Sequence, residues 1–82
     1  MNNKELESLI FHLEKFSVES IKDLIVDLKN IENINSKEKK YQIRDRLENL
    51  MYSEGAGGLI VEGSSLPQVA QKILIIINPH YM

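Results

Sequence analysis

Residues 65–79 read SLPQVAQKILIIINP, and this stretch decides the fold. Its apolar residues recur at spacings of 3, 1, 3, 1 and 3, which is one face of an α-helix; they are Leu66, Val69, Ala70, Ile73, Leu74 and Ile77. Ser65 and Gln68 have the spacing of a capping box, and Pro67 lies in the first turn, where its missing N–H costs little. The stretch therefore predicts a helix that begins near Ser65.

A strand over residues 72–77 competes with this helix, because four of those residues are β-branched. No second convincing strand is present in the sequence to pair with it, so the helix is the preferred interpretation. We expect Asn78 and Pro79 to stop the helix.

Three earlier segments show the same period, and they predict helices at about 3–15, 18–30 and 36–53. Their apolar positions are Leu6, Leu9, Ile10, Leu13 and Phe16, then Ile21, Leu24, Ile25, Leu28 and Ile31, then Ile43, Leu47, Leu50 and Met51. Ser17 and Ser36 stand where the N-caps of the second and third helices belong.

The glycines at positions 55, 57 and 58 are expected to end the third helix, because glycine adopts a positive φ without strain. Residues 59–61 are then expected to form one short helical turn, which Gly63 and Ser64 break. The sequence thus predicts an all-α fold, a compact five- or six-helix bundle, in a single domain over residues 1–82.

Composition narrows the classes of function. The chain has 82 residues, no cysteine and a net charge of −2. Without cysteine it has no disulfide framework and no thiolate, which fits a cytoplasmic protein. The longest apolar run, residues 73–77, is far too short to span a bilayer, and the polar N-terminus does not resemble a signal peptide. We expect a cytoplasmic protein with no membrane partner.

The charges are unevenly distributed along the chain. Residues 1–35 hold four lysines and seven acidic residues, whereas residues 36–50 hold five basic and three acidic residues. This contrast has two interpretations. The charged side chains could form solvated helix faces, or they could form complementary patches for self-association or for a partner.

The sequence offers no evident catalytic or metal chemistry. His12 and His80 are its only histidines and lie 68 residues apart, unlike zinc ligands, which lie close together in sequence. Glu19 and Asp23 would share a helix face, but paired carboxylates act as acid and base only in a cleft that separates their pKa values. We therefore expect no enzyme, no cofactor, no metal and no small-molecule substrate.

Two sequence features indicate which macromolecules the chain could bind, a short lysine cluster and a pair of isoleucines. A short lysine cluster precedes Tyr41, but Glu38 interrupts it and the net charge is acidic, so we expect no nucleic-acid binding. Ile75 and Ile76 fall outside the apolar stripe of the last helix. That helix is therefore either central to the bundle or packed against another chain. The resulting candidate interaction surface comprises Glu19, Asp23, Asp27, Lys40, Arg44, Arg46, Ile75 and Ile76.

A further pattern runs through most of the chain. A leucine-rich first segment leads to Phe16, and a Ser-x-Glu motif then opens the second helix; the residues are Ser17, Glu19, Ile21, Asp23, Leu24 and Leu28. A basic helix, a glycine–leucine step and a closing Asn-Pro follow; the residues are Arg44, Arg46, Leu47, Leu50, Gly58, Leu59, Asn78 and Pro79. Together these features resemble bacterial death-like domains, in particular the effector-associated domains of prokaryotic immune systems.

This resemblance implies a six-helix death-like bundle without catalytic residues. It also implies a homotypic adaptor that couples a sensor to an effector, such as a protease, a nuclease or a pore-former, in bacterial immunity. The partner would then be a protein with a like domain, or a second copy of the chain. The alternative function is that of a small regulatory protein, like an antitoxin or a repressor, that binds a toxin or nucleic acid.

Overall fold

The computed structural model describes residues 3–53 and 55–82 and is mostly helical. Within them it has four α-helices, α1 (Lys4–Glu14), α2 (Lys22–Lys29), α3 (Lys37–Tyr52) and α4 (Leu66–Tyr81). Three short 3₁₀ helices accompany them, η1 (Glu19–Ile21), η2 (Ile31–Asn33) and η3 (Gly55–Gly58). Two short strands, β1 (Ile60–Val61) and β2 (Ser64–Ser65), pair as an antiparallel hairpin.

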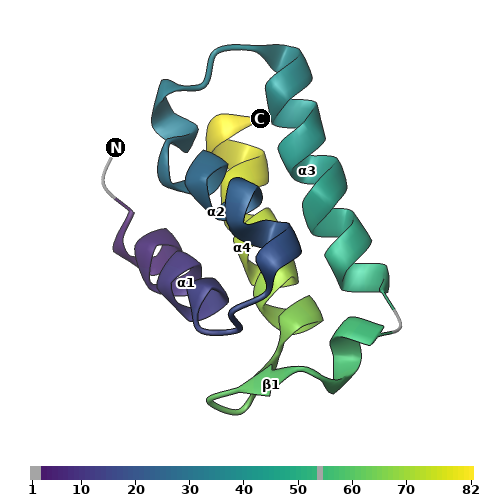
Figure 1. Ribbon diagram of the computed structural model, residues 1–82. Helices are drawn as coiled ribbons and strands as arrows, with labels where there is room; N and C mark the ends of the chain where they lie inside the picture. Colours follow the sequence, from purple (N-terminus) through teal and green to yellow (C-terminus); the bar gives the residue numbers. More distant parts are fainter. Residues whose placement is uncertain (1–2, 54) are drawn as a thin grey trace.

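The all-α class is confirmed, but the predicted count of five or six helices is wrong, because the shorter segments form 3₁₀ turns and a hairpin. Figure 1 shows α3 running down one edge of the molecule and α4 running back beside it, with α1 on the opposite side. Helix α4 packs against both α3 and α1, and α1 also contacts α2. Every position of its predicted apolar stripe is buried, so α4 is the central element of the core.

The N-terminus of α4 forms as predicted. The Gln68 backbone N–H donates to Ser65 Oγ at 3.3 Å, and the Ser65 backbone N–H donates to Gln68 Oε1 at 2.8 Å. These two bonds complete a capping box. The cap on α3 also forms as predicted, because the Lys39 backbone N–H donates to Ser36 Oγ.

The predicted stop at Asn78 and Pro79 is wrong, because α4 continues to Tyr81. Proline lacks an N–H, so Pro79 removes the helical bond that it would donate to the Ile75 carbonyl, and its ring crowds that carbonyl. The Tyr81 side chain packs against the core, and that contact holds the last turn in place.

The predicted helical turn at residues 59–61 is also wrong. Ile60 pairs with Ser65 and Val61 with Ser64, so this segment is the first strand of the hairpin. The two loop residues, Glu62 and Gly63, have φ angles of 53° and 81°. Positive φ at both positions is typical of the two-residue turns whose twist suits a hairpin.

Ser17 does not cap a helix. It has a φ of 53°, in the left-handed region, and its backbone N–H donates to the Glu14 carbonyl at 3.1 Å. Ser17 therefore belongs to the end of α1, where chains commonly turn in this way. Val18 precedes η1 without a side-chain cap, so the predicted N-cap at Ser17 is wrong.

Candidate interaction surfaces

The structure distributes the eight candidate surface residues over four elements. Glu19 lies in η1, while Asp23 and Asp27 lie in α2. The three basic candidates, Lys40, Arg44 and Arg46, lie in α3, and the two isoleucines lie in α4.

Some basic side chains of α3 already contact the acidic segment of the same chain. Lys39 Nζ on α3 lies 3.1 Å from Asp27 Oδ2 on α2. Arg46 Nη2 donates to the Ser20 carbonyl in η1 at 2.8 Å. These contacts join α3 to the acidic segment beside it, so Asp27 and Arg46 have structural roles in the monomer.

The other side of the N-terminal half of α3 carries a different set of residues, which we term the basic stripe: Lys37, Lys40, Tyr41 and Arg44. Their spacing of i, i+3, i+4 and i+7 places them along one side of the helix. The Tyr41 side chain is 68% exposed. Arg44 Nε donates to Glu48 Oε1 at 3.1 Å, one turn further along α3. The stripe presents an aromatic side chain among three cations.

Ile75 and Ile76 differ in their environments. Ile75 is 64% exposed on the outer side of α4, whereas Ile76 is partly buried and packs against the core. Ile75 lies on α4, which packs against α3, the helix that carries the basic stripe. Of the pair, only Ile75 offers an apolar contact for another chain.

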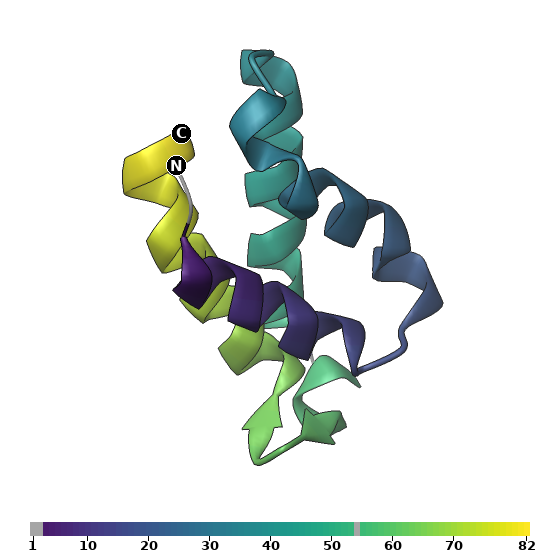
Figure 2. The same cartoon turned by 90° about the vertical axis from the view of Figure 1, so that its left-hand side faces the viewer.

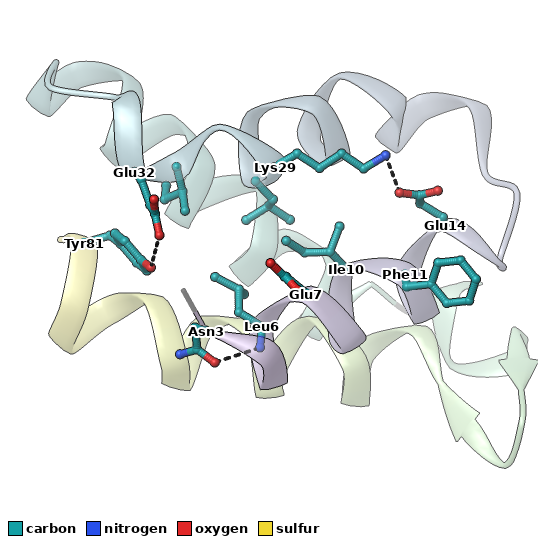
Figure 3. Close-up of a pocket in the computed structure, with 11 residues that line it drawn as sticks. Asn3, Leu6, Glu7, Ile10, Phe11, Glu14, Lys29, Glu32 and Tyr81 are labelled. Atoms are coloured by element: carbon teal, nitrogen blue, oxygen red, sulfur yellow. Dashed lines mark hydrogen bonds and ion pairs between the residues drawn. The ribbon is translucent and has the colours of Figure 1, made fainter. Parts of the chain in front are cut away.

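An open groove of about 850 Å³ lies between α1, α2, η2 and the end of α4 (Figure 3). Its floor is apolar and its rim is mainly acidic. The floor is formed by Leu6, Ile10, Leu28 and Ile31, and the rim carries Glu7, Glu14 and Glu32 together with Lys29. Figure 2 shows the side of the molecule on which it lies, with α1 nearest the viewer.

Each end of the groove is bridged by a polar pair (Figure 3). At one end Lys29 Nζ lies 2.5 Å from Glu14 Oε1. At the other end the Tyr81 hydroxyl donates to Glu32 Oε1 at 3.5 Å. Burial raises the pKa of Tyr81, and the nearby Glu32 carboxylate raises it further, so the phenol stays neutral at physiological pH.

Glu7 lies between these bridged ends and has no ion-pair partner among the described residues. Phe11 follows one turn later on α1, and its ring is 61% exposed. Lys15 Nζ lies 4.9 Å from the centre of that ring, which is a cation–π distance. Glu7, Phe11 and Glu14 therefore form a row along the rim, which we term the α1 row.

This groove was not predicted from the sequence. Its walls come from segments that are up to 78 positions apart, from Asn3 to Tyr81, so no local motif marks it. The one available signal was the i, i+4, i+7 spacing of Glu7, Phe11 and Glu14, which lie beside the apolar stripe of the first helix.

His12 has a structural contact. Its Nε2 atom lies 2.7 Å from the Val61 carbonyl, and its ring stacks on Phe16 at 5.7 Å between centroids. His80 is exposed near the end of α4. Among residues 3–53 and 55–82, no group of three His, Cys, Asp or Glu side chains is arranged to hold a metal ion.

No described helix combines the length and the apolar character needed to cross a membrane. Comparison of the chain with protein-family models, with curated proteins and with solved structures gives no match.

Proposed function

We propose that this domain is a protein–protein interaction adaptor that associates with copies of itself or with like domains. The observation that carries the proposal is the exposure of Tyr41 at the centre of the basic stripe. Tyrosine and arginine are enriched at the energetic centres of protein interfaces, where an aromatic ring supplies buried area.

Charge alone would not hold such a contact together. An exposed ion pair contributes only about 0.2–1 kcal/mol, so several pairs and an apolar centre are needed. Tyr41 supplies an aromatic centre on α3, and Ile75 adds a second apolar side chain on the neighbouring helix. The basic stripe therefore combines the two components that a salt-sensitive interface requires, several cations and an exposed aromatic ring.

The more specific role, coupling a sensor to an effector in bacterial immunity, rests on the resemblance to bacterial death-like domains. That resemblance lies mainly in apolar spacing and turn residues, including the segment from Phe16 to Leu28. Fold analogy is a weak guide to function, so the genomic neighbourhood is the informative observation for this role. A protease, nuclease or pore-former encoded beside this chain would support it.

The basic stripe also favours one alternative function. Three cations and an exposed tyrosine on one helix could contact nucleic-acid phosphates and bases, as in an antitoxin or a repressor. The net charge of −2 argues against it, because nucleic-acid-binding domains are usually basic.

Light scattering across protein concentration and salt tests the adaptor proposal. We expect the mean mass to rise with concentration and to fall as salt screens the charges. Lys40→Glu with Arg44→Glu should abolish the rise while leaving the helical circular dichroism spectrum unchanged. Arg46 is avoided in this test because it bonds to Ser20 within the chain. A protein that stays monomeric at all concentrations and binds no like domain would contradict the proposal.

A further inference from the structure

We infer that the basic stripe of one copy docks on the α1 row of a second copy, at the rim of the groove. This inference rests on the proposed function, because it names the two surfaces through which the domain would associate. Tyr41 would meet Phe11, and the cations of the stripe would meet the rim carboxylates.

The two surfaces match in spacing as well as in charge. Along α1, acid, aromatic and acid occur at Glu7, Phe11 and Glu14, which are positions i, i+4 and i+7. Along α3, base, aromatic and base occur at Lys37, Tyr41 and Arg44, which have the same spacing. At 1.5 Å per residue each row is roughly 10 Å long, so two facing helices can align all three pairs at once.

Both aromatic rings are available for this contact. Phe11 is 61% exposed and Tyr41 is 68% exposed. Phe11 lies between Glu7 and Glu14, with Lys15 Nζ 4.9 Å from the centre of its ring, whereas Tyr41 lies between Lys37 and Arg44. Docking on Phe11 therefore requires the Lys15 side chain to move off the ring, and the flanking charges of the two rings are opposite. Burying the two rings against each other would supply the apolar centre that the weak ion pairs require.

Lys40, the remaining cation of the basic stripe, has a carboxylate that it could meet on the second copy, that of Glu32. Lys40 lies one residue before Tyr41, on the same side of α3. Beyond Glu7, across the groove, the rim carries Glu32, whose Oε1 also accepts from Tyr81. A lysine side chain that reaches over the rim would meet this carboxylate, so the groove itself takes part in the contact.

The placement of the surfaces decides the type of assembly. Helix α1, which carries the α1 row, lies on one side of the molecule, whereas α3 runs along the opposite edge (Figure 1). A chain therefore cannot dock its own stripe on its own row. Each copy offers a donor surface and an acceptor surface, so a head-to-tail contact between copies is heterologous. The rotation between neighbouring copies then decides whether the assembly closes into a ring or continues as an open series.

One-sided variants test this arrangement. Glu7→Lys with Phe11→Ser removes the acceptor surface, and Lys37→Glu with Tyr41→Ser removes the donor surface. All four side chains are exposed, so both variants should keep the helical spectrum of the parent. We expect each variant alone to associate at least about tenfold more weakly than the parent. An equimolar mixture should form a 1:1 complex and nothing larger, because each variant retains the surface that the other lacks.

Matched controls separate this contact from a general effect of charge. Glu5→Lys changes the charge of α1 on its other side, and Lys72→Glu changes an exposed residue of α4. Both should associate as the parent does. The equal spacing of the two rows pairs Glu7 with Lys37 when the two helices run parallel. Combining Glu7→Lys with Lys37→Glu in one chain should then restore association, because the reversed charges are again complementary.

The outcomes distinguish this inference from the proposed function. If the parent associates and each one-sided variant still assembles alone, the contact lies elsewhere and only this inference is overturned. The same conclusion follows if the variants are monomeric and their mixture forms no complex, since the interface would then not join these two surfaces. A parent that stays monomeric overturns both.

Discussion

The Nε2 atom of His12 lies 2.7 Å from the carbonyl oxygen of Val61, 49 residues further along the chain. This contact ties the middle of the hairpin to α1. A second link runs beside it, from Lys15 Nζ to Glu62 Oε1 at 2.6 Å. The hairpin is therefore held by His12 of α1 and by Lys15, the residue that follows α1.

His12→Ala should destabilise the domain by about 1–2 kcal/mol, because it removes this hydrogen bond and the stacking on Phe16. The free energy of unfolding in urea measures the change. His80→Ala is the matched control and should leave the free energy within about 0.5 kcal/mol of the parent, since His80 is exposed. Equal effects of the two substitutions would mean that the His12 contact contributes nothing.

Ser17→Gly should raise the free energy of unfolding by about 0.5–1 kcal/mol. Ser17 has a φ of 53°, where a Cβ atom is strained and glycine is not. The gain is reduced by the extra freedom of glycine in the unfolded chain. Ser53 has a φ of −75°, so Ser53→Gly serves as the control and should bring no gain. A destabilised Ser17→Gly variant would contradict this account of the α1 end.

Stability should depend on pH through Glu62. The hydrogen bond from Lys15, and then its charge, hold the pKa of Glu62 below its ordinary value of 4.5. A lowered folded-state pKa means that this contribution is present above about pH 4.5 and is lost as the pH falls through the folded value. The urea midpoints of the parent and of Glu62→Gln should therefore differ at neutral pH and converge as the pH falls below 4.5 and the carboxylate is protonated. A difference independent of pH would show that the carboxylate charge is not involved.

The two arginines of the candidate surface should behave differently. Arg46→Ala should cost about 1 kcal/mol in the free energy of unfolding, because Arg46 joins α3 to Ser20. Arg44→Ala should change stability by less than about 0.5 kcal/mol, since its partner Glu48 lies on the same exposed helix face. Arg44→Ala should instead weaken association. Urea unfolding and light scattering on both variants would detect a reversal of these roles.

The basic stripe should not bind nucleic acid tightly. We expect no shift of generic DNA or RNA at protein concentrations below roughly 10 μM at low salt, because the stripe belongs to an acidic chain. Lys37→Glu provides the control for any shift that does occur. Tight, salt-sensitive retention that this variant abolishes would favour the regulatory alternative over the adaptor.

Two parts of the fold were predicted correctly from local sequence, although the N-cap placed at Ser17 was not. The capping box at Ser65 and the buried stripe of α4 follow from residues within a few positions of one another. The hairpin was not predicted, because its anchors, His12 and Lys15, lie 47 or more residues from their partners. The end of α4 was missed for a similar reason, since packing of Tyr81 against the core outweighs the effect of Pro79.

For the candidate surface too, the sequence predicted some features, and others became visible only in the folded structure. The count of charges marked residues 36–50 as basic, but it could not show that Arg46 turns toward Ser20 while Arg44 does not. Ile75 and Ile76 are adjacent in sequence, and only the packing of α4 makes one exposed and the other part of the core's edge. The groove could be found only from the complete fold, because its lining residues run from Asn3 to Tyr81.

The central position of α4 has a consequence for how the domain opens. Helices α1 and α3 both pack on α4, so neither can keep its apolar stripe covered when α4 leaves. Local opening that begins at α4 would therefore expose most of the core at once. In native-state hydrogen exchange the slowest amides of α1, α3 and α4 should share one opening free energy, equal to that of global unfolding. The domain then unfolds as a single cooperative unit, and the stretch of sequence that forms α4 determines both the fold and its unfolding.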